Sequence, residues 1–205
     1  MELFSPLQQR CAILAQRFIE IPAERKLLLQ QLAQYVKQQQ LLQQVPQLLF
    51  VCTHNSRRSH LAQVWTSIAA LYYGVEVHSF SAGTEATAFH PNAILALEAA
   101  GCRVRAVTQG PNPRYEVQIG PAHTILCFSK TLQHAEVPKT NFAAIMTCSE
   151  ADAGCPVVLR SAQRIALKYH DPKAYDNTIL EQEMYIERSN QIALEQMYVV
   201  AQVVP

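Results

Sequence analysis

The sequence predicts an α/β protein with an open, mainly parallel twisted sheet and helices on both faces. From residue 47 onwards, short apolar segments alternate with segments of helical periodicity, the pattern of βαβ units. Residues 1–46 contain no glycine and are rich in Gln and Leu, which indicates an N-terminal helical extension. Two apolar segments within residues 115–129 are separated by Gly120-Pro121, which predicts an inserted β-hairpin.

The N-terminal extension is expected to form two helices, at about 6–20 and 22–43, because apolar residues recur there at helical spacing. Pro22 suits a helix start, and Pro46 closes the segment. We therefore divide the chain into an extension, 1–46, and an α/β domain, 47–205. The extension either packs on the domain as a helical hairpin or forms a homodimer interface or partner surface.

The elements of the α/β domain follow from alternating apolar runs and turn residues. Gly74 and Gly101 are expected to end two of the helices as C-caps. The expected helices are Arg58–Tyr73, Pro91–Ala100 and Leu180–Val203. The expected strands are Gln47–Cys52, Val75–Ser81, Tyr115–Ile119, Thr124–Ser129, Phe142–Thr147 and Arg164–Tyr169.

The composition is that of an ordinary globular protein. The 205 residues are 49% hydrophobic and 16% charged, with a formal net charge of +1, which argues against nucleic acid or anionic membranes as partners. The N-terminus lacks the basic segment followed by an apolar stretch that is typical of a signal peptide. No apolar run is long enough to cross a bilayer. A cytoplasmic location is expected, in which the six cysteines are free, catalytic or redox-active thiols.

The segment VCTHNSRRS, residues 51–59, is the strongest chemical signal. Cys52 ends a strand, Arg58 opens a helix, and the two are separated by five residues. Backbone N–H groups and the helix N-terminus in such a loop surround a tetrahedral oxyanion, and Arg58 binds two of its oxygens. The same positive surroundings favour the thiolate form of Cys52, which is a nucleophile. The residues expected around the oxyanion are Thr53, His54, Asn55, Ser56, Arg57, Arg58 and Ser59.

Two further signals fall at the ends of later strands. Cys148 follows an apolar strand, so it is expected at the same carboxyl edge of the sheet as Cys52, where ligands bind in open parallel sheets. Cys155 follows in a small, polar, glycine-containing segment. Asp171, in His-Asp-Pro, comes directly after another strand, and a carboxyl group beside a bound anion suits a general acid. The alternative is that Cys148 and Cys155 are structural cysteines and that the Asp-Pro dipeptide only forms a turn.

With these motifs, residues 47–205 resemble low-molecular-weight protein tyrosine phosphatases, and above all the thioredoxin-coupled arsenate reductases built on that fold. Ser81-Ala82-Gly83 and the helix start Pro91-Asn92-Ala93 extend the likeness. The resemblance implies no metal or organic cofactor, and thioredoxin as the reductant. It implies these roles: Cys52 as nucleophile, Arg58 as oxyanion clamp, Asp171 as general acid, Cys148 and Cys155 as redox pair, Ser59 as hydrogen-bond donor to the sulfur, and Asn55 as the residue that holds the loop.

Four features depart from the family pattern. His54 stands where phosphatases usually carry Gly. Arg57 stands where many relatives carry Cys or Ala, and its charge is expected to reinforce oxyanion binding. Gln63 stands where potassium-binding arsenate reductases carry Glu, which weakens the case for a potassium site. The hairpin at 113–129 lengthens the chain between the loop and the redox pair.

Three functional hypotheses follow. The leading one is an arsenate reductase with a disulfide relay. The alternative is a low-molecular-weight phosphatase that acts on phosphotyrosine or a small phosphate ester with the same Cys52, Arg58 and Asp171; a redox pair at Cys148 and Cys155 distinguishes the two. A non-catalytic oxyanion sensor is the third, and the complete set of Cys52, Arg58 and Asp171 argues against it.

Overall fold

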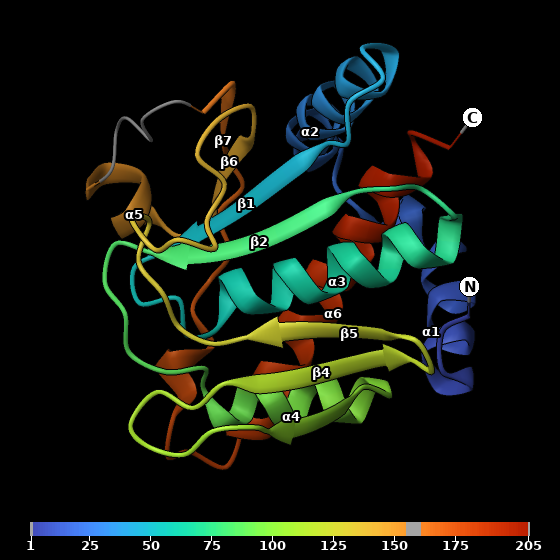
Figure 1. Ribbon diagram of the computed structural model, residues 1–205. Helices are drawn as coiled ribbons and strands as arrows, with labels where there is room; N and C mark the ends of the chain where they lie inside the picture. Colours follow the sequence, from blue (N-terminus) through green and yellow to red (C-terminus); the bar gives the residue numbers. More distant parts are fainter. Residues whose placement is uncertain (1, 155–160, 205) are drawn as a thin grey trace.

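The main sheet has four parallel strands in the order β2-β1-β6-β7. The computed structural model describes residues 2–154 and 161–204. The strands are β1 (Gln47–Cys52), β2 (His78–Gly83), β6 (Ala143–Met146) and β7 (Gln163–Ala166) (Figure 1). Because β1 lies between β2 and β6, connections leave it in both directions, and its carboxyl end is the switch point where ligands bind.

Helices cover both faces of this sheet, as predicted. Leu48 and Phe50 of β1 belong to a core shared with α3 (Arg58–Tyr73) and α6 (Glu181–Ala201). Leu49 and Val51 belong to a second core on the opposite face, under the short helix α5 (Ser149–Gly154). The alternation along β1 is what a strand buried on both faces requires.

A second sheet of three antiparallel strands lies beyond α3, which separates it from β2 in Figure 1. Its strands are β3 (Arg103–Ala106), β4 (Tyr115–Gly120) and β5 (His123–Cys127). The β4–β5 hairpin confirms the predicted insertion. The four-residue β3 was not predicted, and it follows α4 (Pro91–Ala100) and Gly101.

Most predicted boundaries lie within two residues of those in the structure, and β1, α3 and α4 agree at both ends. The strand predicted to end at Tyr169 ends at Ala166. The second strand begins at His78 rather than Val75, because the N–H of Val75 donates to the carbonyl of Ala70 at 2.9 Å and closes α3. Gly74 and Gly101 have φ of 67° and 113°, the left-handed conformation expected at helix ends. The helix α5 was not predicted.

The N-terminal residues form α1 (Ser5–Ala15), a short 3-10 helix η1 (Phe18–Glu20) and α2 (Ala23–Leu41). The first predicted helix therefore ends early, where Arg17 leaves helical angles, and the second ends before Gln43, whose φ is 55°. Apolar side chains of both helices join the core of the α/β domain: Leu7, Cys11, Leu14, Leu29, Leu32 and Val36.

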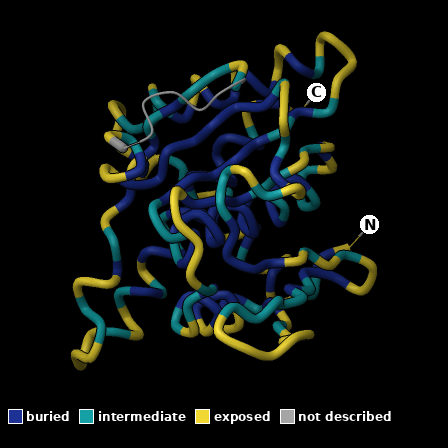
Figure 2. Tube along the Cα trace, turned by 60° about the vertical axis from the view of Figure 1, so that its left-hand side comes forward, coloured by how far each residue is buried: buried dark blue, intermediate teal, exposed yellow. Residues whose placement is uncertain are grey.

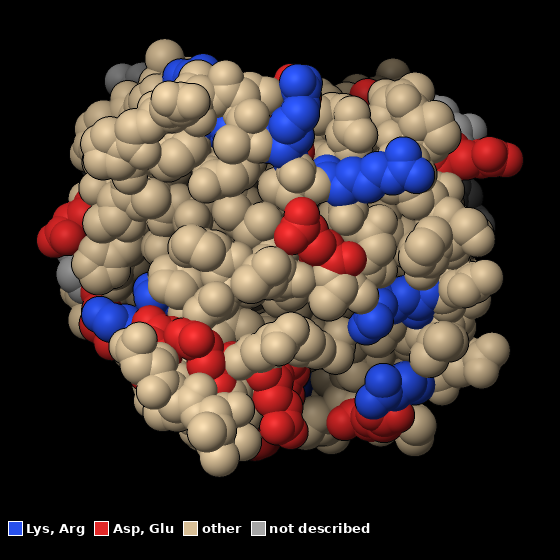
Figure 3. Space-filling view, turned by 90° about the horizontal axis from the view of Figure 1, so that it is seen from below, with Lys and Arg blue, Asp and Glu red and all other residues tan. Residues whose placement is uncertain are grey.

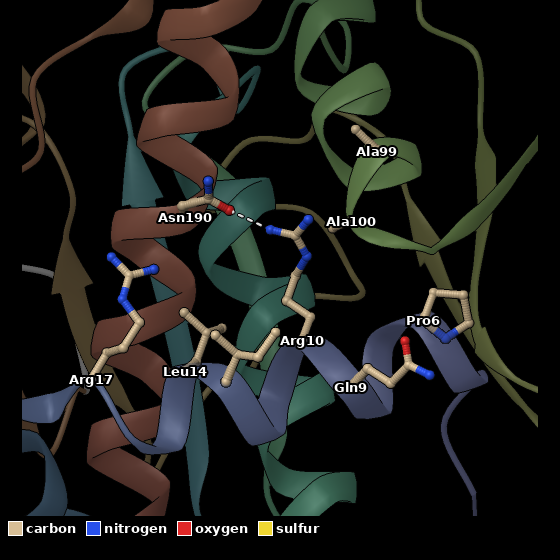
Figure 4. A pocket seen from close by; sticks show the side chains of 9 residues that line it. Pro6, Gln9, Arg10, Leu14, Arg17, Ala99, Ala100 and Asn190 are labelled. Carbon is tan, nitrogen blue, oxygen red and sulfur yellow. Dashed lines mark hydrogen bonds between the residues drawn. The ribbon is translucent and has the colours of Figure 1, made fainter.

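Polar contacts also join the extension to α6. Arg10 of α1 donates to Asn190 at 2.9 Å, beside a cavity of about 320 Å³ between α1, α4 and α6 (Figure 4). Arg25 of α2 makes a bidentate salt bridge with Glu195, with hydrogen bonds of 2.9 and 2.8 Å. The structure thus shows the extension packed on the domain.

Burial and charge follow the same architecture. The tube is dark blue along the inner strands and helices, and yellow gathers at loops and helix ends (Figure 2). The face in Figure 3 carries both signs of charge among mostly uncharged residues. None of the helices in the described residues is both long and apolar enough to cross a membrane.

Candidate active site

The anion loop begins at Cys52, at the carboxyl end of β1, and ends in the first turn of α3. The sulfur of Cys52 is 3.1 Å from the hydroxyl oxygen of Ser59. That oxygen accepts a hydrogen bond from the side-chain amide of Asn55 at 2.9 Å. The hydroxyl proton of Ser59 is therefore available to donate to the Cys52 sulfur.

Asn55 holds the loop from its centre. It is completely buried and has a φ of 44°, in the left-handed region that asparagine tolerates better than most residues. Its side-chain oxygen accepts from the backbone N–H of Lys130 at 2.9 Å. One side chain thus ties the loop to Ser59 and to the chain after β5.

Loop carbonyls are held by residues outside the loop. The carbonyl of His54 accepts from the Ser129 hydroxyl at 2.8 Å, and that of Ser56 accepts from the N–H of His90 at 2.9 Å. Within the described residues, the N–H groups of residues 54–57 donate to no backbone carbonyl. Such a set of free N–H groups beside a helix N-terminus is a nest for an anion.

Gly83, at the end of β2, allows the loop to approach the sheet. A Cβ at this position would lie 2.4 Å from the carbonyl oxygen of Glu85, 2.6 Å from that of Thr53 and 2.7 Å from the backbone nitrogen of Asn55. These neighbours are all backbone atoms, so the loop itself would have to move.

We therefore expect Gly83→Ala to weaken oxyanion binding about tenfold or more, because the displaced loop misaligns several charge-assisted N–H contacts. The measurement is the protection of Cys52 from alkylation by increasing phosphate. Gly74→Ala is the control: it strains a φ of 67°, but its Cβ would meet no atom within 4 Å. Equal phosphate affinity in both variants would contradict this role of Gly83.

Arg58 is positioned to clamp an anion. Its guanidinium is buried and donates to the carbonyl of Tyr169 at 2.9 Å and to the carboxylate of Asp171 at 2.5 Å. Its Nε is also buried, and it has no hydrogen-bond partner among the described residues. A buried charged donor without a partner is costly, and a bound oxyanion would satisfy it.

Asp171 reaches the loop from the end of the β7 segment. Its carboxylate accepts from the N–H of Lys173 at 3.1 Å and so caps the 3-10 helix η2 (Pro172–Tyr175). The side chain is 33% exposed, so water and substrate oxygens have access to it. The structure thus brings Asp171 next to Arg58, 113 residues away in sequence.

Cys148 lies beside the loop, just after the carboxyl end of the neighbouring strand β6. Its sulfur is fully buried, 3.4 Å from the hydroxyl of Thr53, the residue after Cys52. It also accepts from the N–H of Ala151 in α5 at 3.3 Å. An N–H donor stabilises a developing thiolate. Cys155 and the proline after it lie outside the described residues.

The side chains of His54 and Arg57 lie next to neighbouring carboxylates. The imidazole of His54 is half exposed, with its Nε2 3.4 Å from a carboxylate oxygen of Glu85. The guanidinium of Arg57 donates to the Tyr185 hydroxyl at 2.6 Å and to Asp176 at 3.0 Å. The side-chain charge of Arg57, expected to reinforce oxyanion binding, is therefore already paired.

Glu150 adds a carboxylate near Cys148. The pKa of this exposed side chain is lowered, chiefly by a hydrogen bond from its own backbone N–H and then by a contact with Cys148. The charges of Arg58 and His54 act in the same direction. Glu150 therefore stays ionised at the edge of the site.

A buried polar cluster supports the loop from behind, and sequence analysis did not identify it. Ser81 donates to the side-chain oxygen of Gln63 at 2.6 Å, so it accepts from Nδ1 of His60 at 3.1 Å. Burial, and then the charge of Lys130, hold the pKa of His60 well below its usual value, so the ring is neutral. Burial also lowers the pKa of Lys130. These contacts join residues far apart in sequence and have no local pattern.

The remaining cysteines of the described chain are structural. Cys11, Cys102 and Cys127 are buried in the core, and burial raises the pKa of each thiol to about 12. A buried, protonated thiol of this kind packs as a small apolar side chain. In the described residues, no group of three His, Cys, Asp or Glu side chains is arranged to hold a metal ion.

The curated relatives of this chain are arsenate reductases, one of the two classes of protein that the loop motif resembles. No family model matches the chain. An arsenate reductase of Brevibacillus brevis is 28% identical over 123 residues, 60% of this chain and 74% of the relative. One of Bacillus subtilis is 27% identical over 139 residues, 68% and 83% of the two chains. Among solved structures, a low-molecular-weight phosphotyrosine phosphatase from Vibrio cholerae O395 gives a TM-score of 0.49 at 15% identity, and covers 76% of this chain and 94% of its own.

Proposed function

We propose that this chain, an arsenate-reductase-like member of the low-molecular-weight phosphatase superfamily, reduces arsenate to arsenite through a cysteine disulfide relay. The observation that carries the proposal is the second buried cysteine at the loop. The sulfur of Cys148 lies 3.4 Å from the hydroxyl of Thr53, next to the nucleophile Cys52. A phosphatase needs the loop and the acid, whereas a reductase also needs this thiol.

The first step forms a bond between Cys52 and arsenic. The loop N–H groups, with Arg58 and its free Nε, hold the arsenate oxygens. The Cys52 thiolate attacks arsenic, the bond to one arsenate oxygen breaks, and Asp171 gives its proton to that oxygen, which leaves as water. Arsenic remains As(V) in this adduct.

The second step is the reduction. The Cys148 thiolate attacks the sulfur of Cys52, and the sulfur–arsenic bond breaks with its electron pair on arsenic. Arsenite leaves as As(III), and the two sulfurs form a disulfide. The Cys155 thiolate then attacks the sulfur of Cys148 and releases the Cys52 thiolate. A dithiol reductant returns Cys148 and Cys155 to thiols.

Two partner expectations belong to the proposal. Thioredoxin is the expected dithiol reductant, because a disulfide at Cys148 and Cys155 would need a surface partner for exchange. A homodimer through the N-terminal helices also stays a prediction. The exposed large apolar side chains of that region are Ile13, Ile19, Leu27, Leu41 and Leu42.

The relay predicts the behaviour of Cys155→Ser. We expect this variant to form at most one arsenite per chain and then to stop as a Cys52–Cys148 disulfide, detectable by mass analysis of its peptides. Cys102→Ala, which changes a buried core thiol, is the control that keeps turning over. Sustained thioredoxin-coupled turnover by Cys155→Ser would contradict the relay, and hydrolysis of aryl phosphates without arsenite formation would identify a phosphatase.

A further inference from the structure

We infer that Arg57 is a positioning residue that fixes the general-acid segment against the anion loop, an inference that rests on the proposed function. The two consecutive arginines of the loop contact opposite ends of η2. Arg58 pairs with Asp171, the N-cap of η2, and Arg57 pairs with Asp176, its C-cap. The short helix that carries the acid is therefore held at both ends by adjacent residues of the loop.

The Arg57 contact is closed into a triangle by Tyr185 of α6. Arg57 donates through Nε to the Tyr185 hydroxyl at 2.6 Å and through a terminal nitrogen to Asp176 at 3.0 Å. The Tyr185 hydroxyl donates to the other oxygen of Asp176 at 2.7 Å. Burial raises the pKa of Tyr185 and keeps this donor protonated. A planar guanidinium makes two directed bonds at once, which a lysine cannot reproduce.

His90 joins the same group to the loop. Its backbone N–H donates to the carbonyl of Ser56 at 2.9 Å, and its ring stacks on Tyr185 with centroids 5.3 Å apart. Its Nδ1 accepts from Asn92, so Nε2 carries the proton and faces Asp176 at 3.9 Å. Burial and the charge of Arg57 lower the pKa of His90, which favours the neutral ring.

The charge balance separates positioning from anion binding. The side chains of Arg57 and Asp176 are only 12% and 21% exposed, and they form a neutral pair. Most of the field of Arg57 at a bound oxyanion is thus cancelled by Asp176. Removal of both partners uncovers no net charge and should leave oxyanion affinity to Arg58 and the loop amides. Removal of either partner should loosen the placement of Asp171.

The test uses full-length Arg57→Met and Asp176→Asn. We expect about tenfold faster hydrogen exchange at the N–H groups of η2, since its C-terminal end is released. Phosphate affinity, measured by protection of Cys52 from alkylation, should stay within about twofold in the double variant, which leaves neither charge unpaired. Single-turnover arsenite formation should slow by about 10- to 100-fold in each variant. Arg57→Lys should recover part of the rate. The double variant should be no slower than the slower single variant.

Arg17→Met is the control, because it removes a bidentate arginine–carboxylate contact, with Glu20, in the N-terminal extension away from the loop. It should change neither η2 exchange nor the chemical step. Unchanged η2 exchange in Arg57→Met, an unchanged chemical step, or a loss confined to phosphate affinity would each overturn the inference. Wild-type protein that binds phosphate but forms no arsenite would instead contradict the proposed function, and the η2 exchange would still decide whether Arg57 holds the Asp171 segment.

Discussion

Arg58→Lys is expected to lower single-turnover arsenite formation by about 10²- to 10³-fold, the effect of removing one preorganised donor from an oxyanion site. The guanidinium of Arg58 already donates to Tyr169 and Asp171 and still has a buried, unpartnered Nε. A lysine ammonium keeps the charge but not the planar fork that satisfies all three directions. Phosphate affinity should fall as well, because the ground-state anion loses the same contacts.

The measurement is rapid-quench arsenite formation at saturating reductant, together with phosphate protection of Cys52. Arg105→Lys serves as the control, since Arg105 pairs with Glu116 on the surface and is 73% exposed. A rate for Arg58→Lys within threefold of the wild type would show that Arg58 does not hold the reacting anion.

Asp171→Asn is expected to slow the same step by about 10²- to 10⁴-fold, the contribution typical of a positioned general acid. Asparagine retains an oxygen to accept from the N–H of Lys173, so the cap of η2 is preserved. It cannot give a proton to the departing oxygen. Phosphate affinity should be unchanged or higher, because a carboxylate beside the anion has been removed.

This variant separates chemistry from binding. The rate of Cys52 alkylation, which needs no general acid, should match that of the wild type, while arsenite formation falls. Normal arsenite formation by Asp171→Asn would assign the proton to another donor.

The parts of the fold that sequence analysis predicted have local signals. The apolar run of β1, the glycine after α3 and the proline that opens α4 each mark an element within a few residues. Cys148 was predicted at the loop because strand ends of a parallel sheet share one edge. The helix α5 was not predicted, since Ser149–Gly154 is short and ends in glycine.

The missed features of the site depend on contacts between distant residues. Asn55 receives the N–H of Lys130, 75 residues away, and Arg57 meets Asp176 and Tyr185, 119 and 128 residues away. No spacing in the sequence marks such pairs. The sequence shows that Arg57 adds a positive charge to the loop. Only the structure shows that this charge is paired with Asp176. The division at residue 46 and the role of Cys155 stay predictions.

The central claim is that Cys148 carries electrons from a dithiol reductant to arsenic. It is tested most directly by NADPH consumption in the presence of thioredoxin, thioredoxin reductase and arsenate, for the wild type and Cys148→Ser. We predict steady consumption by the wild type and none above background by Cys148→Ser, whose Cys52 should still be alkylated and protected by phosphate. Equal consumption by both proteins would contradict the relay.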